Sequence, residues 1–223
     1  MKNKSLSFLK IKGFYHILRQ DPLFVVKAIV RRPFLYFFRF LSFFKAKRTP
    51  IRDQAYLYGF KEVKDFKKKL TSKDTLLILG ISYCQRPKNC PAIRFSNMCP
   101  IKHDICSICP YFSFAQLPRK DDSFIMIATA LDLGKKIIQM QRKYPKKEIL
   151  FAVSVCELSQ EIYALFSHIL GVKGIAFSLN GPTCSNFRSF QFAEKGQKKA
   201  ITYTDISQNQ HLKELLDLRK NTT

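Results

Sequence analysis

Residues 75–84 of the chain read T-L-L-I-L-G-I-S-Y-C. The first eight form an uncharged run of strand length that begins after Asp74, a pattern typical of a strand buried on both faces. Two similar runs follow, E-I-L-F-A-V-S-V-C at 148–156 and G-I-A-F-S-L-N at 174–180. We therefore predict three buried strands, each of which ends on a cysteine or is closely followed by one.

Helical patterns alternate with these strands. Asp122 or Ser123 offers an N-cap for one helix, which Pro145 ends. Residues 158–169 form the apolar face of a second helix, which Gly171 ends. Strands and helices in this rhythm indicate parallel β-α-β units. The predicted fold is α/β, an open and mostly parallel sheet with helices on both faces. Three further elements are predicted: an amphipathic helix within 51–73, a half-exposed strand at 198–206 and a last helix at 209–220.

Length and charge indicate one folded domain with a basic arm. The 223 residues suffice for one full-sized core and are few for two. We predict an aromatic, basic arm over residues 1–50 and a cysteine-rich α/β domain over residues 51–223. Lys and Arg number 39 against 16 Asp and Glu, a formal charge of +23, and the arm has twelve basic residues against the single acid Asp21. Such a field attracts phosphates, either of lipid headgroups or of nucleic acid.

The segment from Asp21 to Arg48 is apolar, but it does not have the pattern of a membrane span. Basic residues break it into runs shorter than the roughly 18–20 residues that spanning requires. On a helix these charges form one stripe beside an aromatic face, and Pro33 divides the segment into two short helices. The stripe is typical of a helix lying on anionic lipid; the alternatives are an apolar face packed on the core and, least favoured, a nucleic-acid arm. The predicted membrane or anion contacts are Lys27, Arg31, Arg32 and Arg39.

Five of the seven cysteines lie in one loop, Y-C-Q-R-P-K-N-C-P-A-I-R-F-S-N-M-C-P-I-K-H-D-I-C-S-I-C-P at 83–110. Three are followed by proline, which stiffens the loop so that neighbouring thiols can point at a common centre. The other two follow or end the later strands, and the carboxyl ends of parallel strands line one crevice. We therefore predict a single metal site. Its candidate ligands are Cys84, Cys90, Cys99, Cys106, Cys109, Cys156 and Cys184.

The spacing of the cysteines favours an iron–sulfur cluster over zinc. Zinc sites typically use two paired knuckles, whereas this loop has one C-x-x-C pair, Cys106 and Cys109. Clusters tolerate irregular spacing, and a cysteine followed by proline occurs in ferredoxin loops. Zinc stays the alternative cofactor, and metal-free thiol chemistry comes third. Arg94, in the same loop, is a candidate anion contact, although a solvated arginine is the commoner role.

Three groups of motifs follow one another in a fixed order. L-G-I-S-Y-C, N-C-P-A and C-S-I-C lie within 79–109, A-V-S-V-C-E-L lies at 152–158, and a strand then leads into a turn with one cysteine and Asn186. This order resembles an uncharacterised seven-cysteine family, domain of unknown function 116, over about residues 75–186. The resemblance implies that all seven cysteines and Glu157 occupy the family's recurring positions, and it implies membrane association and metal or cluster binding without an established reaction. Glu157 could orient a substrate, although a carboxylate in a first helical turn more often interacts with the helix dipole.

The leading functional prediction is a cytoplasmic, membrane-surface protein that binds an iron–sulfur cluster in electron transfer or cofactor metabolism. Seven thiols cannot all pair and the first residues lack the pattern of a signal peptide, which predicts a reducing compartment. The protein would be peripheral on the inner face of the membrane, with anionic lipid and a redox partner protein as its partners. Two rival predictions are a zinc-stabilised module that binds RNA through the arm, and a metal-free thiol-dependent enzyme.

Overall fold

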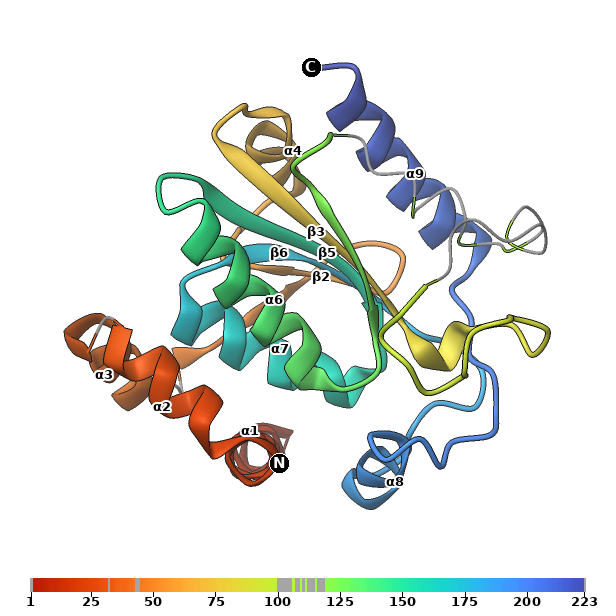
Figure 1. The fold of residues 1–223 in the computed structure, drawn as a ribbon, viewed down its shortest axis with the longest axis horizontal. Coiled ribbons are helices and arrows are strands. Elements are labelled where there is room, and N and C mark those ends of the chain that lie inside the picture. The colour runs from red at the N-terminus through yellow and green to blue at the C-terminus, as the bar shows by residue number, and fades with distance from the viewer. Residues whose placement is uncertain are drawn as a thin grey trace.

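Within the described residues, six strands form one sheet in the order β1-β2-β6-β5-β3-β4, and helices cover both faces (Figure 1). The computed structural model describes residues 2–31, 33–42, 45–99, 106, 109, 111, 115 and 119–222. The strands are β1 (Arg48–Pro50), β2 (Ala55–Tyr58), β3 (Thr75–Ser82), β4 (Ser123–Ile127), β5 (Glu148–Val155) and β6 (Lys173–Ser178). The pairs β3–β4, β3–β5 and β5–β6 are parallel, whereas β1 and β2 extend the sheet in antiparallel fashion beyond β6. The predicted fold class is confirmed.

The α-helices other than α8 form three groups around this sheet. The amino-terminal group precedes the sheet, α6 and α7 lie on one face, and α4 and α9 lie on the other (Figure 1). A short 3-10 helix, η2 (Tyr83–Gln85), follows β3 directly. The α-helices are α1 (Lys2–Gln20), α2 (Pro22–Arg31), α3 (Pro33–Leu41), α4 (Val63–Thr71), α6 (Ala130–Lys143), α7 (Glu157–Leu170), α8 (Phe187–Ala193) and α9 (Ile206–Lys220).

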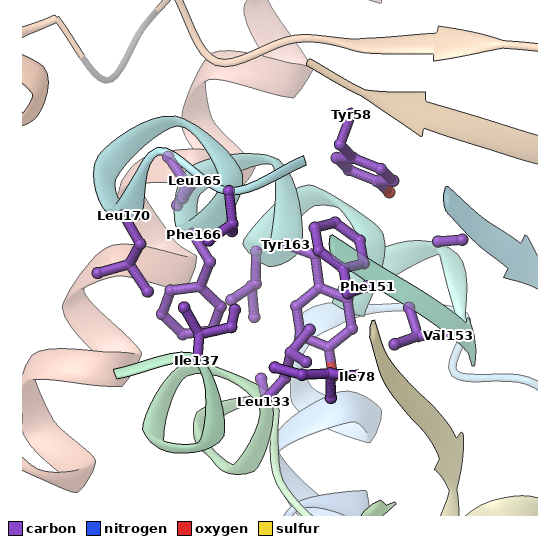
Figure 2. Packing of buried hydrophobic residues seen from close by; sticks show 14 of the residues in the cluster. Tyr58, Ile78, Leu133, Ile137, Phe151, Val153, Tyr163, Leu165, Phe166 and Leu170 are labelled. Carbon is purple, nitrogen blue, oxygen red and sulfur yellow. The ribbon is translucent and has the colours of Figure 1, made fainter. Parts of the chain in front are cut away.

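Alternate residues of the central strands build two separate apolar layers, because successive side chains of a strand point to opposite faces. Ile78 of β3 and Phe151 and Val153 of β5 pack with α6 and α7, as Figure 2 shows. Leu77 and Leu79 of β3 point the other way and pack with α4 and α9. Both faces of β3 are thus covered, which explains why its sequence is an uninterrupted apolar run.

The segment after the cysteine loop begins with a strand, so the prediction of a helix capped by Asp122 or Ser123 is wrong. Residues 123–127 form β4, which pairs with β3 from Ile78–Ser123 to Ser82–Ile127. The helix begins at Ala130, and Thr129 caps it in a reciprocal pair with Asp132. The short run S-F-I-M-I is apolar enough for a strand, and its pairing with β3 decides the outcome.

Residues 198–206 do not form the predicted half-exposed strand. Tyr203 makes one isolated antiparallel bridge with Asn180, and Thr202 donates its backbone N–H to the carbonyl oxygen of Cys84 at 3.0 Å. The alternation of the segment arises because Thr202 is buried while Tyr203 faces solvent. The last helix begins at Ile206, and β1, β2 and α8 were not predicted.

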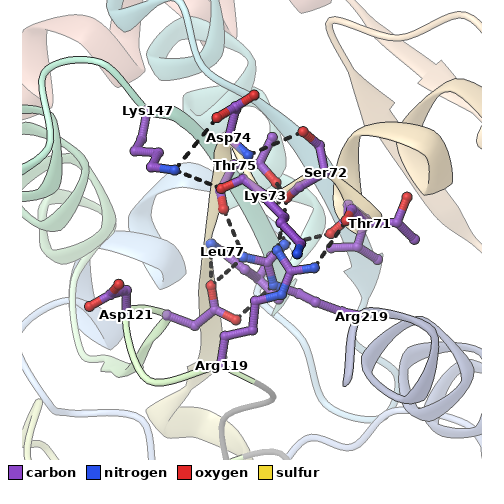
Figure 3. Close-up of polar contacts among 12 residues, drawn as sticks. Thr71, Ser72, Lys73, Asp74, Thr75, Leu77, Arg119, Asp121, Lys147 and Arg219 are labelled. Carbon is purple, nitrogen blue, oxygen red and sulfur yellow. Dashed lines mark hydrogen bonds and ion pairs between the residues drawn. The ribbon is translucent and has the colours of Figure 1, made fainter. Parts of the chain in front are cut away.

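The carboxyl-terminal helix is tied to the sheet by a buried ion pair. Arg219 donates through Nε and Nη2 to the two carboxylate oxygens of Asp122 at 2.7 and 2.5 Å, and neither side chain is exposed. Its other bonds reach Thr75 at the start of β3 (Figure 3) and the carbonyl of Leu70 in α4. Asp122 therefore links α9 and the strands, and it is not a helix cap.

The arm is helical, and Pro33 separates α2 from α3 as predicted. α1 packs on α7, where Ile17 is buried and a Cβ added to Gly13 would lie 3.0 Å from Ile162. The rings of Phe24 and Phe166 meet edge to face. Over the described part of the chain, no helix is both long enough and apolar enough to cross a membrane.

One side of α2 and α3 faces solvent with large apolar side chains. More than half of each side chain's accessible area is exposed at Leu23, Val26, Val30, Phe34, Phe37, Phe38 and Leu41. Of the four predicted membrane or anion contacts, Arg32 and the side chains of Lys27 and Arg31 lie outside the described residues, and Arg39 is half-buried. The arm thus packs on the core with one side and leaves an apolar row uncovered with the other.

Candidate metal centre

Three cysteines from distant parts of the chain meet at one edge of the sheet. Cys84 lies in η2 after β3, Cys156 directly follows β5, and Cys184 lies in the turn after β6. Because β3, β5 and β6 are adjacent and parallel, their carboxyl ends point to the same edge. All three thiols line one pocket of about 20 Å³, which we call the thiol pocket. The sequence predicted this convergence from the order of the strands.

Cys156 is the thiolate of this group. A hydrogen bond from the Cys184 thiol lowers the pKa of Cys156. The Ser159 hydroxyl, 3.3 Å from the Cys156 Sγ, also lowers this pKa, whereas burial raises it. Cys156 is also the N-cap of α7, where the positive end of the helix dipole favours a negative charge. The hydrogen bond to Cys156 and burial raise the pKa of Cys184 instead. Both shifts favour the thiolate form at Cys156 and the thiol form at Cys184.

Lys198 supplies the positive charge beside these thiols. Its Nζ lies 4.0 Å from the Sγ of Cys184, and its charge acts to lower the pKa of each cysteine of the thiol pocket. For Cys84 burial is the larger effect, and its pKa is raised overall. Lys198 was not among the predicted site residues, because it lies among several lysines in a segment that was expected to be a strand.

The other four cysteines belong to the loop and form a second group, which we call the loop thiols: Cys90, Cys99, Cys106 and Cys109. Burial raises the pKa of Cys99; Arg86 opposes this shift, and the charges of the other three loop thiols add to it. The other three loop thiols therefore lie within electrostatic range of Cys99. The backbone N–H of Cys109 donates to the carbonyl oxygen of Cys106 at 3.0 Å, which holds the two cysteines of the C-x-x-C pair close together.

Cys84 lies between the two groups. It lines the thiol pocket, and it also belongs to the apolar layer against which Cys99 and Cys109 pack. The structure thus brings Cys156 and Cys184 to the first cysteine of the loop. Across the described residues, no group of three or more His, Cys, Asp or Glu side chains is close enough together to hold a metal ion.

A buried arginine organises the loop between these groups. Arg86 is 2% exposed, and its guanidinium donates to the carbonyl oxygens of Ile93, Arg94, Ser96 and Met98. A planar fork with several N–H donors suits this task, because it can hold carbonyls that approach from different directions. The same charge favours a thiolate at Cys99. No sequence pattern indicates this role, since the acceptors are backbone groups.

Arg94 joins the loop to the segment that carries Lys198. Its guanidinium donates to the carbonyl oxygens of Lys199 and Ala200, the second at 2.5 Å. With the bond from Thr202 to Cys84, this contact holds Lys198 beside the thiol pocket. Arg94 was predicted as an anion contact or a solvated side chain. In the structure these N–H groups donate to backbone carbonyls.

The two other predicted polar residues lie at the amino-terminal ends of helices. Glu157 is the first residue of α7, its side chain is largely exposed, and one oxygen lies 3.3 Å from Arg48. Asn186 is the N-cap of α8, and its side-chain oxygen accepts from the backbone N–H of Ser189 at 2.9 Å. Both positions favour these residue types for local reasons.

A buried glutamate connects the thiol pocket to the arm. Glu194 lines the pocket, and its carboxylate accepts hydrogen bonds from the backbone of Ala130 and from Gln20 at 2.8 Å, and lies 2.7 Å from Nε2 of His16. His16 and Gln20 are one turn apart on α1. Nothing in the sequence pairs residues that are so far apart, so Glu194 was also missed.

No protein-family model, curated protein or solved structure matches this chain. The resemblance to the seven-cysteine family therefore stays a prediction.

Proposed function

We propose that the chain binds an iron–sulfur cluster through its cysteines and acts in electron transfer or cofactor metabolism at an anionic membrane surface. One observation carries the metal part of this proposal. Cys84, Cys156 and Cys184 gather at one edge of the sheet beside Lys198, and the loop thiols form a second group beside Arg86. Metal ligands must be deprotonated, and neighbouring cations favour the thiolate form.

The loop thiols are the residues that would hold the cluster. Four thiolates form the usual ligand set of [2Fe–2S] and [4Fe–4S] clusters, and the same number suits structural zinc. A bound cluster would supply one-electron transfer. Arg86 would fix the loop backbone and offset part of the thiolate charge, and Cys84 would connect the loop thiols to the thiol pocket.

A metal-free dithiol is the second candidate function, and the Cys156–Cys184 pair favours it. A lowered pKa at Cys156 provides a nucleophilic thiolate, and the thiol of Cys184 is within hydrogen-bonding reach. Cys156 would attack a disulfide of a partner and release one of its thiols, and Cys184 would then displace the second thiol. The pair would end as a disulfide and the partner as a dithiol, so that two electrons pass to the partner.

The membrane part of the proposal is supported by the exposed apolar row of α2 and α3. Contiguous exposed apolar residues mark interaction surfaces, and a helix with aromatic residues beside basic ones suits the interface of an anionic membrane. The rival RNA partner is less favoured, because the exposed aromatic residues cluster together instead of interleaving with the charges.

Anaerobic purification followed by iron, sulfide and zinc analysis and a visible spectrum tests the metal proposal. We expect iron and sulfide with thiolate-to-iron absorption, and we expect both to be lost in Cys99→Ser. Met98→Ser is the matched control, because it replaces an exposed sulfur side chain next to Cys99. Its metal content should equal that of the wild type.

The alternative outcomes separate the candidate functions. Stoichiometric zinc with RNA binding would favour the zinc module. No metal, together with a disulfide between Cys156 and Cys184 after mild oxidation, would favour the dithiol. Equal iron in wild type and Cys99→Ser would contradict the assignment of the loop thiols as ligands.

A further inference from the structure

A pocket lined by basic residues lies where α3, the end of α7 and the start of β6 meet. Its volume is about 410 Å³, within the range of roughly 300–1,000 Å³ of small-molecule sites. We call it the basic pocket. Its charged lining residues are Arg39, Lys45, Lys47, Lys61 and Lys173, with His168 beside them.

Among the described lining residues of the basic pocket there is no carboxylate, although one acidic residue lies nearby. Lys173 lies 3.3 Å from Glu148, which is outside the lining. Lys45, Lys47 and Lys61 are exposed, and they make no ion pair with any residue that the structure describes. Like charges that share one concave surface repel each other and concentrate the positive potential there, so the site favours an anion.

The wall of the basic pocket is fixed by Arg39 and the end of α7. Gly171 ends α7 in the left-handed conformation with φ +66°, and a Cβ at this position would collide with the guanidinium of Arg39. The hydroxyl of Ser42 lies 3.0 Å from Nε2 of His168, which ties the end of α3 to α7. A glycine is thus needed both for the turn and for the arginine that lies over it.

The same helix that supplies Arg39 presents uncovered apolar side chains. Phe34, Phe38 and Leu41 of α3 are 80%, 65% and 59% exposed. An anionic site and an apolar surface on one short helix match the two parts of a phospholipid, which has an anionic headgroup and apolar chains. A nucleic acid would use the charge and leave these side chains in water.

We propose that the basic pocket binds the phosphate headgroup of one anionic phospholipid, whose acyl chains lie against the exposed side of α3. This inference rests on the membrane part of the proposed function and adds a defined site to it. Lys47 and Lys61 face the phosphate from the strand side of the pocket, and Arg39 faces it from α3. The lipid would replace the missing carboxylate as the counter-charge of the pocket.

The test uses the full chain and short-chain dihexanoyl phosphatidylglycerol below its micelle concentration, with binding measured by calorimetry. We expect saturable binding of one lipid per chain. The double variant K47A/K61A should weaken it about thirtyfold, from the loss of two lysines near a phosphate. The matched control is K68A/K213A, which removes two exposed lysines of α4 and α9 outside the pocket and should change the affinity less than about threefold.

A second pair of measurements identifies the source of the phosphate. Phe38→Ser should weaken lipid binding and leave the binding of glycerol phosphate unchanged, because it alters only the apolar contact. Inorganic phosphate or glycerol phosphate that binds as tightly as the lipid would overturn the lipid assignment. Circular dichroism confirms that each variant is folded.

Sedimentation with phosphatidylglycerol and phosphatidylcholine vesicles separates failure of the basic pocket from failure of membrane binding. If the wild type sediments with anionic vesicles while K47A/K61A and K68A/K213A lose affinity equally, the pocket is wrong and membrane association stands. If the wild type sediments with neither vesicle, both are wrong. Tight RNA binding in place of lipid binding would likewise overturn the inference.

Discussion

We expect replacement of Arg219 by Met to destabilise the protein by about 3–5 kcal/mol, the cost of removing one partner of a buried ion pair. The guanidinium is fully buried, and it donates to both oxygens of Asp122 and to the carbonyl of Thr75 at 2.9 Å. After the substitution the carboxylate of Asp122 would keep one acceptor bond, from the backbone N–H of Leu77 at 2.8 Å. A charged group would then stay in the interior without the cation that pairs with it directly.

Asp122→Leu should cost a similar amount, because it leaves the guanidinium of Arg219 unpaired. The double variant removes both charges. We therefore expect its loss of stability to be smaller than the sum of the two single losses, by at least about 2 kcal/mol. Removal of Asp122 still leaves the Leu77 N–H without its acceptor, which costs about 1–3 kcal/mol and keeps the double variant less stable than the wild type.

Urea unfolding followed by circular dichroism measures these differences, and thermal unfolding gives a second readout. At about 2–4 °C per kcal/mol for a chain of this size, the melting temperature of Arg219→Met should fall by roughly 6–20 °C. Arg52→Met, at an exposed arginine, is the control and should stay within about 0.5 kcal/mol of the wild type. A loss below about 1 kcal/mol for Arg219→Met, or simple additivity of the two single variants, would refute the reasoning.

Two further predictions concern the cysteines in metal-free protein. Arg86→Lys keeps the charge but loses the planar fork that holds the loop carbonyls. Cys99 should then be alkylated faster than in the wild type, as measured by peptide mass spectrometry. An unchanged rate would argue against the role of Arg86 in ordering the loop. The alkylation of Cys156 by iodoacetamide should have its midpoint below the usual thiol value of about 8.5, because its folded pKa is lowered and the thiolate persists as pH falls. Ser159→Ala should move this midpoint upward, and a wild-type midpoint at or above about 8.5 would contradict the assignment of the thiolate.

The part of the site that the sequence could predict is the part that follows from strand order. Uncharged runs identify buried strands, and parallel strands bring their carboxyl ends together, so Cys84, Cys156 and Cys184 could be placed at one edge before the structure was known. The same rule could not place β4. Its apolar run follows Asp122 directly, and an aspartate before an apolar segment reads equally well as a helix cap.

The residues that tune the thiols could not be predicted, because their partners are distant in sequence or belong to the backbone. Arg86 bonds to carbonyl groups, which carry no sequence signal. Lys198 reaches Cys184 only because Arg94 and Thr202 hold its segment at the sheet edge. A local pattern reports local structure, whereas these contacts depend on the packed fold.

The arm and the thiol pocket are parts of one packed unit, and this changes how the arm can be studied. Glu194 lines the pocket, and its buried carboxylate depends on His16 and Gln20 of α1. Without α1 the carboxylate would keep its bond from Ala130, but its Oε2 would lose both side-chain partners. A buried acceptor atom without partners costs about 1–3 kcal/mol, or more when it is charged. Deletion of the arm therefore disturbs the thiols as well as the lipid-facing surface. Substitutions on the outer sides of α2 and α3 leave the contacts of Glu194 in place, so only they separate lipid binding from the chemistry of the cysteines.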